Sequence, residues 1–357
     1  MLLSADSLSA QPLASLETPR QEQVILVNVH DGEQRETAPS PMLTIELTSP
    51  SDVALPPPCE AQNGVLDLAA VTSDLTITVC QDGTVSVDDG LHAVSGLRGV
   101  ERIVGGGGSD TLIGPAGDTT WQITSRNAGT VLGVVFENVE NLQGAPDNED
   151  TFVFAEGGSI SSVVDGGAGG FDSIVIQGGG SDPIVVDHTG PDSGAISRGM
   201  SLVSYTGLEP VLVDADPGVN ITYNLPDVPA VGDTVELRLV SGTSFILDSL
   251  NNTFEDTTFA DPGAGATVTI NLRAGDDTIT VKNTLAAALV ISGGTGNDTL
   301  SLNGAAATLA SDGSSVTVGG KAIAISSVEP YYQRELRHRL HLASPTHGRL
   351  AAPGGLE

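Results

Sequence analysis

The stretch that decides the fold is Gly293-Gly294-Thr295-Gly296-Asn297-Asp298-Thr299-Leu300-Ser301, which has the form Gly-Gly-x-Gly-x-Asp-x-apolar-x. Glycine adopts positive φ at no steric cost, so these residues let the backbone turn tightly with carbonyl oxygens directed inward. Asp298 supplies a carboxylate, and Leu300 begins a strand whose apolar side chain points into a core. The same pattern occurs at Gly105-Gly106-Gly107-Gly108-Ser109-Asp110-Thr111-Leu112-Ile113. The pattern predicts tight turns that alternate with short strands.

The composition of the whole chain agrees with such turns and strands. Among 357 residues there are 44 Gly and 20 Pro, and only 3% are aromatic, which disfavours one large globular core. Short runs of Val, Ile and Leu between clusters of Gly, Asp and Asn are typical of many short strands. Residues 75–79 and 84–87 alternate with period two around Asp82-Gly83, which predicts a hairpin or a solenoid corner. We therefore expect an all-β fold, an irregular parallel β-solenoid or β-helix-like stack of short strands with Gly/Asp turns.

Changes in composition and residue pattern along the chain predict four regions. We expect an export-associated or linker region with two strands at 1–63 and a first β-repeat region at 64–215. A second β-repeat region follows at 216–330, and a basic tail at 331–357. The two N-terminal strands are expected near 24–29 and 43–47, between prolines. We interpret the tail as a disordered terminus or a truncated or shifted reading frame in preference to a basic interaction segment, although 331–342 could form a short helix.

Two internal repeats point to duplication of a short β unit. Residues 97–105 are echoed by 136–144, an offset of 39 residues from Val100 to Val139. The unit "small or polar, Val or Leu, Glu" recurs at 207–209 and 327–329. Chance similarity in a biased composition is the alternative interpretation.

The spacing of the aspartates predicts where loops could share a cation. Ca²⁺ takes about 6–8 oxygen ligands, so two loops on successive turns must face each other to complete a site. Asp277 lies 21 residues before Asp298, and Asp150 lies 22 residues before Asp172, each a plausible turn of a solenoid. The predicted carboxylate ligands of Ca²⁺ are Asp277, Asp298, Asp110, Asp150, Asp172 and Asp182. The alternative is that these are metal-free Gly/Asp turns.

The nonapeptide resembles the haemolysin-type, or RTX, repeat of secreted bacterial proteins. In that family consecutive repeats form a parallel β-roll, and Asp carboxylates and loop carbonyls of adjacent turns bind Ca²⁺. By position in the motif, the resemblance implies further ligands from the loop residues Gly105, Gly107, Ser109, Gly275, Gly293, Thr295 and Asn297. This chain has no uninterrupted run of nonapeptides, so we expect an irregular solenoid with a few calcium sites.

The N-terminus carries a second resemblance. Met1-Leu2-Leu3-Ser4-Ala5-Asp6 resembles the end of the Leu-Glu-Pro-Arg-x-Leu-Leu-Ser-Ala-Asp signature near the start of very large bacterial surface proteins, and 121–154 is similar to repeats in those proteins. Residues 1–16 lack the basic and apolar segments of a signal peptide. The resemblance implies an export region upstream of Met1 and an extracellular or cell-surface location.

The charge of the chain restricts its partners. Lys and Arg number 14 against 45 Asp and Glu, a net charge of -31. Such a surface repels nucleic-acid phosphate, and divalent cations are its natural counter-charge. No apolar stretch is long enough to span a membrane. We expect calcium ions as partners, together with surface glycans or other cell-surface proteins, and neither nucleic acid nor a membrane span.

No motif of a known catalytic site stands out, and we expect a protein that is not an enzyme. His188 is expected in an exposed turn, and the adjacent acids 276–277 should point to opposite faces of a strand. The leading hypothesis is a calcium-binding structural or adhesin-type segment of a secreted or cell-surface protein. The alternatives are a polysaccharide-active β-helix enzyme such as a lyase, and a solenoid that binds carbohydrate or ice through threonines such as those at 76, 78, 267 and 269. Cys59 and Cys80 could form a disulfide or be two unrelated thiols.

Overall fold

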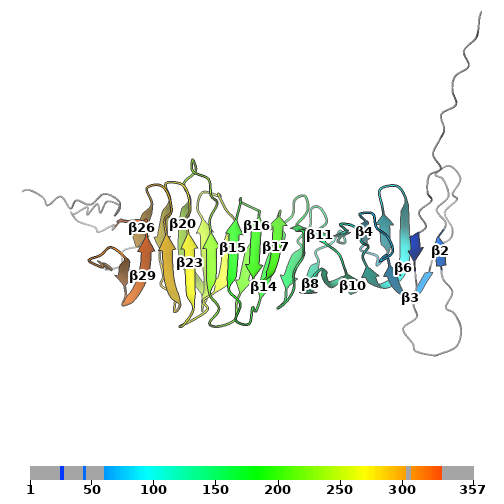
Figure 1. Cartoon of the computed structure of the whole chain (residues 1–357), viewed down its shortest axis with the longest axis horizontal. Helices are drawn as coiled ribbons and strands as arrows, with labels where there is room; N and C mark the ends of the chain where they lie inside the picture. Colours follow the sequence, from blue (N-terminus) through cyan, green and yellow to red (C-terminus); the bar gives the residue numbers. More distant parts are fainter. Residues whose placement is uncertain (1–24, 28–42, 46–59, 303–306, 332–357) are drawn as a thin grey trace, which may run out of the picture.

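The computed structural model describes residues 25–27, 43–45, 60–302 and 307–331, and within them it is all-β with no helix. The strands stand side by side along the long axis of the molecule (Figure 1). Near the N-terminus, β1 (Ile25–Val27) and β2 (Leu43–Ile45) pair in antiparallel fashion, which confirms the two strands expected there. No helix long and apolar enough to cross a membrane occurs in the described ranges.

The remaining strands form two sheets that face each other across a shared core. Sheet 1 contains β3 (Glu60–Asp67), β6 (Ala93–Val104), β8 (Thr120–Ser125), β9 (Ala128–Val131), β10 (Val134–Glu137), β12 (Thr151–Phe154), β14 (Ser173–Gln177), β18 (Val211–Asp214), β20 (Thr234–Ser241), β21 (Ser244–Ser249), β22 (Thr257–Ala260), β24 (Thr278–Val281), β26 (Thr299–Leu302) and β30 (Glu329–Tyr331). Sheet 2 contains β4 (Thr76–Val79), β5 (Val85–Asp88), β7 (Thr111–Ile113), β11 (Asn141–Gln143), β13 (Val163–Asp165), β15 (Ile184–His188), β16 (Gly194–Arg198), β17 (Ser201–Thr206), β19 (Ile221–Asn224), β23 (Thr267–Asn271), β25 (Ala288–Ser292), β27 (Ala307–Leu309), β28 (Ser315–Val318) and β29 (Lys321–Ser326). The start of β6 also pairs with β5, so β6 joins the two sheets.

The chain crosses repeatedly between the sheets, and each circuit is one coil of a solenoid-like stack. Equivalent strands of successive coils pair in parallel: β12 with β14, β14 with β18, and β23 with β25. Thr151 pairs with Ser173, and Thr278 pairs with Thr299. The coil lengths of 22 and 21 residues expected from the aspartate spacing are therefore confirmed, as is the fold class.

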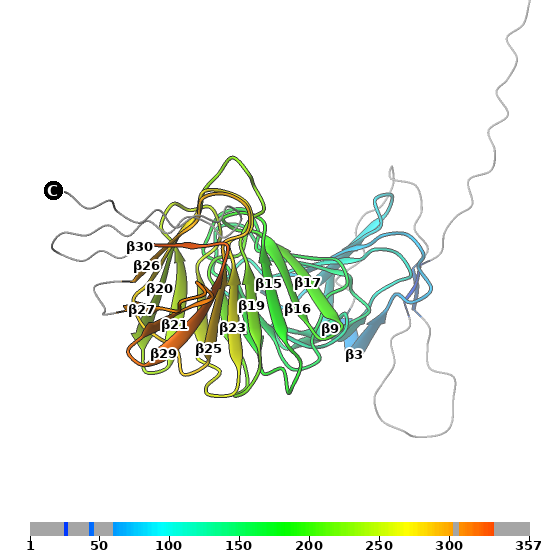
Figure 2. The same cartoon turned by 60° about the vertical axis from the view of Figure 1, so that its left-hand side comes forward.

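Five antiparallel meanders within the described residues make the stack irregular. In each one the chain runs up, down and up before it leaves the sheet; the meanders are β4–β5–β6, β8–β9–β10, β15–β16–β17, β20–β21–β22 and β27–β28–β29. The first contains the turn expected at Asp82-Gly83, which is a hairpin with φ of 77° at Gly83. Meanders lengthen some coils well beyond 22 residues, and Figure 2 shows the resulting continuous succession of strands.

The boundary expected between 215 and 216 falls inside this continuous stack. The β18 strand of the first predicted region pairs with β22 of the second, and β15 pairs with β19. At the other predicted boundary, Tyr331 ends β30, and the basic tail from 332 onwards lies outside the described residues.

The core lies between the sheets and is mostly aliphatic. Strand residues alternate between buried and partly exposed positions, as in β23 and β25. Two aromatic clusters add to the core: Trp121 stacks on Phe152 at 5.2 Å and meets Phe136 edge-on at 6.2 Å, and Phe259 packs against Tyr223 and Phe245. A thin two-sheet core needs few large side chains, which accounts for the low aromatic content.

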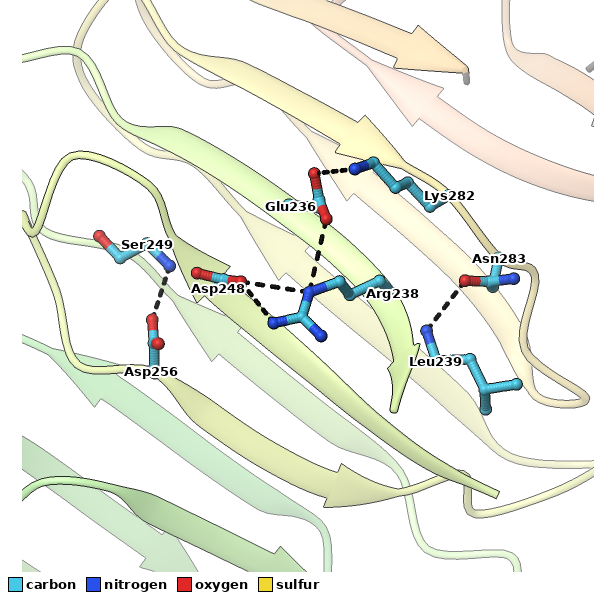
Figure 3. Close-up of polar contacts among 8 residues, drawn as sticks. All are labelled: Glu236, Arg238, Leu239, Asp248, Ser249, Asp256, Lys282 and Asn283. Carbon is cyan, nitrogen blue, oxygen red and sulfur yellow. Dashed lines mark hydrogen bonds and ion pairs between the residues drawn. The ribbon is translucent and has the colours of Figure 1, made fainter. Parts of the chain in front are cut away.

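An ion network ties one meander to the next coil (Figure 3). On the outer face of sheet 1, Lys282, the residue after β24, pairs with Glu236 on β20 at 2.6 Å. Arg238 then bridges Glu236 at 3.4 Å and Asp248 on β21 at 2.8 Å. The network of two acids and two bases therefore joins β20 and β21 to the end of β24, so the hairpin stays in register with the stack.

At the corners between the sheets, neighbouring coils approach too closely for side chains. A Cβ atom on Gly105, Gly166 or Gly293 would lie 2.0 Å from the carbonyl oxygen of Asn138, Gly207 or Ser327, respectively. Each of these carbonyls belongs to the first residue of a recurring unit "small or polar, Val or Leu, Glu". That first residue has positive φ in all three units: 55° at Asn138, 62° at Gly207 and 51° at Ser327. The two motifs of the sequence thus stack on each other in adjacent coils.

The 39-residue offset between Val100 and Val139 is not the spacing of neighbouring coils. The β6 and β10 strands pair Ile103 with Phe136. The residue before Val100, Gly99, also has positive φ, at 70°. The repeated unit is therefore a type of corner and not a whole coil.

These contacts predict different outcomes for two glycines of one motif. A methyl group on Gly105 would collide with backbone, whereas a methyl group on Gly107 would meet its nearest atom at 3.6 Å. Gly105→Ala should destabilise the protein by about 2–3 kcal/mol, the cost of overpacking a rigid site. Gly107→Ala should change the free energy of unfolding by less than about 0.5 kcal/mol. Denaturant unfolding measures both, and equal losses would contradict this account of the corner.

Candidate metal centre at the acidic corner

One corner of the stack carries a row of buried aspartates, each placed just before a strand of sheet 1. The register of the sheet sets Asp150 beside Asp172, because Thr151 pairs with Ser173. Similarly, the pairs Thr234–Thr278 and Thr278–Thr299 set Asp233 beside Asp277 and Asp277 beside Asp298. We call these five residues the aspartate row; their exposed fractions are 3% or less.

Within the row, three aspartates accept a hydrogen bond from the backbone of the coil before them. Asp298 Oδ1 accepts the Asp277 N–H at 3.1 Å, and Asp277 Oδ1 accepts the Asp233 N–H at 2.7 Å. Asp172 Oδ1 accepts the Asp150 N–H at 2.7 Å. These carboxylates satisfy backbone donors that the turn would otherwise bury without partners.

A second set of aspartates makes the bond in the reverse direction. Asp276 Oδ1 accepts the Asn297 N–H at 2.9 Å, one residue before the bond between Asp277 and Asp298. The corner formed by Asp74 with Ser109 repeats this arrangement at 2.7 Å. Adjacent coils are therefore braced in both directions, by an exposed carboxylate from one and a buried carboxylate from the other.

The row accumulates charge that burial makes costly. Burial, together with the neighbouring carboxylates of Asp233 and Asp298, raises the pKa of Asp277 to about 7. Burial likewise raises the pKa of Asp172 to about 6, with Asp150 adding to the effect. The pKa values of Asp150 and Asp233 are also raised, mainly by burial. Because these pKa values are raised, the buried carboxylates of the row favour their protonated form more than ordinary carboxyls do.

The structure brings together both aspartate pairs on which the calcium prediction was based, and it separates the other two candidates from them. Asp110 lies at the opposite corner, where the chain passes from sheet 1 to sheet 2. Its Oδ1 accepts the Leu75 N–H at 3.0 Å, and its own N–H donates to Glu140 Oε2 at 3.1 Å. Asp182 lies in an exposed turn, bonded through its N–H to Gly179 O at 2.9 Å.

The loop residues expected to supply carbonyl oxygens lie beside these carboxylates. Gly293 is buried at the corner of Asp298, whereas Thr295 and Asn297 are exposed. Thr295 O accepts the Gly275 N–H at 3.0 Å, which joins two of the expected ligands across coils. At the opposite corner, the Gly107 N–H donates to Val71 O at 2.7 Å. Gly105 O accepts from the side chain of Asn138, and Ser109 Oγ accepts from that of Asn141.

Sequence reasoning missed Asp233, which stands in the row next to Asp277. It lacks the glycine-rich loop, but it begins Asp233-Thr234-Val235, which matches Asp277-Thr278-Ile279 and Asp298-Thr299-Leu300. The triplet of Asp, Thr and an apolar residue is the signal that would have found it. The physical reason is that the Asp turns inward at the corner and the apolar residue enters the core.

The row offers hard oxygen ligands but not a complete site made of side chains. Across the described residues, no three His, Cys, Asp or Glu side chains come together in a geometry that could hold a metal ion. Asp233 Oδ2 and Asp150 Oδ1 are nevertheless buried oxygens without a hydrogen-bond donor. Their chemistry fits Ca²⁺ at the row, with loop carbonyls needed to complete the coordination.

Two other expectations concern residues away from the row. The prediction that His188 lies in an exposed turn was wrong: His188 ends β15 with its side chain fully buried against Phe254. Adjacent acids do separate as expected, since Asp276 is exposed and Asp277 is buried. Cys80 is a partly buried free thiol, and Cys59 lies outside the described residues.

Comparisons with protein-family models, with curated proteins and with solved structures gave no match to this chain.

The charge of the row predicts how stability depends on pH without calcium. A carboxyl whose pKa is raised on folding contributes its stability at low pH and loses it as pH rises through the folded value. For Asp277 the loss falls between pH 4 and pH 7 and is on the order of 4 kcal/mol. Asp277→Asn, which retains the Oδ1 acceptor, should flatten this dependence, whereas Asp276→Asn at the exposed neighbour should not. Thermal unfolding in EDTA at several pH values measures this pH dependence of stability. The same slope in the wild type, Asp277→Asn and Asp276→Asn would refute the assignment of the effect to Asp277.

Proposed function

We propose that this chain is a calcium-binding structural segment of a secreted or cell-surface protein, of the adhesin type, and that Ca²⁺ bridges successive coils of the stack. The observation that carries the proposal is the aspartate row, in which Asp233, Asp277 and Asp298 occupy three successive positions of one corner in sheet 1. The resemblance of the loop at 293–301 to the haemolysin-type repeat supports it.

Electrostatics explains why a cation would bind there. Neighbouring strands lie about 4.8 Å apart, and two unit charges at that distance repel by roughly 3 kcal/mol at an effective dielectric constant of about 20. Nearby bases do not relieve this repulsion, because Arg273 pairs with Asp187 and Lys282 with Glu236. One divalent ion between two coils would offset the repulsion and engage the buried oxygen of Asp233.

The bonds already present set a condition on calcium binding. Asp277 and Asp298 each give one oxygen to a backbone N–H of the preceding coil. A cation must therefore use the remaining oxygens together with the loop carbonyls of residues such as Gly275 and Gly293. The backbone braces hold the carboxylates in place in the absence of metal, so Ca²⁺ acts as a local staple of a formed corner.

A structural role also agrees with the state of the basic side chains. A polysaccharide-active enzyme would need a groove lined with cations and acids that face the substrate. In the described residues, Arg198 instead donates to the backbone carbonyls of Gln177 and Gly158, and Arg102 pairs with Glu137. These side chains hold coils together.

Calcium should raise the stability of the protein measurably. A ligand at 100 times its Kd that binds only the folded form stabilises it by about 2.7 kcal/mol. We expect the melting temperature at pH 7.5 to rise between EDTA and millimolar Ca²⁺. Asp277→Asn and Asp298→Asn should lose most of the response, since each removes a charge but keeps an acceptor for the backbone.

Asp182→Asn is the matched control, because that residue is exposed and lies away from the row. It should respond to Ca²⁺ as the wild type does. No calcium response in the wild type would leave the aspartates as a metal-free brace, and a response that survives both row variants would place the ion elsewhere.

A further inference from the structure

In the middle of the stack, the corner position of the aspartate row is occupied by glutamates. The pairing of Ile174 with Val211 and of Val211 with Thr257 sets Glu209 and Glu255 in the two coils after Asp172. Glu209 is exposed, but only 6% of Glu255 is exposed. No ion pair in the described part of the chain includes Glu255.

All the charged groups that face Glu255 are negative. They are Glu209 before β18, Asp192 in the turn between β15 and β16, and the adjacent Asp256. The Asp256 carboxylate itself accepts the Ser249 N–H at 2.7 Å (Figure 3). The phenol of Tyr205 on β17 is close enough for Glu255 to affect its ionisation. Burial, together with these three acids, raises the pKa of Glu255 to about 8.

A buried histidine packs against the same corner from the opposite sheet. His188 Nε2 lies 3.3 Å from Thr257 Oγ1, and Thr257 Oγ1 donates to Glu255 O at 3.4 Å. The ring centroids of His188 and Phe254 are 5.1 Å apart. The charged group that acts on His188 is the cation Arg273, and burial with this neighbour lowers the pKa of His188 to about 3.

The polar atoms of this cluster are enclosed between the sheets. His188 Nδ1 and Tyr205 Oη are both buried without hydrogen-bond partners. Gly194 stands between their strands, and a Cβ there would lie 2.7 Å from Tyr205 Oη. An added charge at this point has neither water nor a counter-ion to stabilise it.

We propose that Glu255, Tyr205 and His188 form a proton-dependent joint in the middle of the solenoid, which holds neighbouring coils together while Glu255 is protonated and His188 is neutral. Ionisation of Glu255 places a fourth negative charge at the corner and loosens the contact of β18 with β22, where the Val211 N–H bonds to Asp256 O at 3.3 Å. Protonation of His188 places a cation in the core beside Arg273. The joint opens on either side of mildly acidic pH and does not depend on calcium.

Glu255 and His188 make stability depend on pH in opposite directions: we call the loss at high pH the alkaline limb and the loss at low pH the acid limb. Glu255 has a raised pKa, so its contribution is present below about pH 4.5 and is lost progressively up to about pH 8. His188 has a lowered pKa, so its contribution is present above about pH 6.5 and is lost as pH falls toward 3.

Glu255→Gln tests the alkaline limb. The measurement is made in EDTA, which removes Ca²⁺, so its outcome does not depend on whether the protein binds calcium. Hydrogen exchange of the β18 and β22 amides, corrected for intrinsic rates, should show protection that falls up to about tenfold per pH unit between pH 5 and pH 8 in the wild type. In Glu255→Gln this fall should be much smaller, and what remains should be the part that the aspartate row contributes. The variant should also melt above the wild type at pH 8.5 and match it at pH 4.5. Glu101→Gln, at an exposed site, is the control and should follow the wild type.

His188→Phe tests the acid limb and should retain protection between pH 6 and pH 4 where the wild type loses it. Carbon-13 NMR of the wild-type carboxyl groups covers the case in which a variant fails to fold. One glutamate must titrate far above the ordinary value of about 4.3. Glutamates that all titrate near that value, or a Glu255→Gln variant with the wild-type pH dependence, would overturn the proposal.

Discussion

The structure depends on the close approach of backbones at the corners of the stack. Parallel strands in successive coils fix the spacing, and a corner must bring one coil's carbonyl onto the next coil's α-carbon. At Gly166 and Gly293 the space for a Cβ atom is already occupied by Gly207 O and Ser327 O. Strand pairing on both faces, and hence the two-sheet core, is possible only because glycine stands at these points.

The buried carboxylates follow from the same constraint. A tight corner turns backbone N–H groups inward, and water cannot reach them. Asp172, Asp277 and Asp298 supply the missing acceptors from the neighbouring coil. One acceptor per coil at one register position produces a column of like charges. The carboxylates that satisfy the backbone therefore also create an electrostatic cost, which protonation relieves and which the proposed calcium ions would relieve.

Meanders accommodate the remaining sequence without breaking the stack. Each meander adds a down and an up strand within one sheet, so the chain leaves the sheet in the direction in which it entered. The β20–β21–β22 meander separates Asp233 from Glu255 by one strand and carries the ion network on its outer face. The cluster around His188 spans another meander and the facing sheet, which explains how a histidine at the end of a strand becomes fully buried.

Local chemistry in the sequence was enough to predict strands, corners and coil length. Glycines before an aspartate, followed by Thr and an apolar residue, determine a tight turn into a strand, and the 21-residue spacing of Asp277 and Asp298 is the register of neighbouring coils. Only the tertiary structure decided which corners stack: Asp110 has the same motif but lies at the opposite corner, and Asp233 lacks the motif but joins the row. The burial of His188 and Glu255 was likewise decided by the facing sheet. The physical reason is that a motif fixes the turn of its own chain segment, whereas the neighbours of that turn depend on how many strands the chain inserts before it returns.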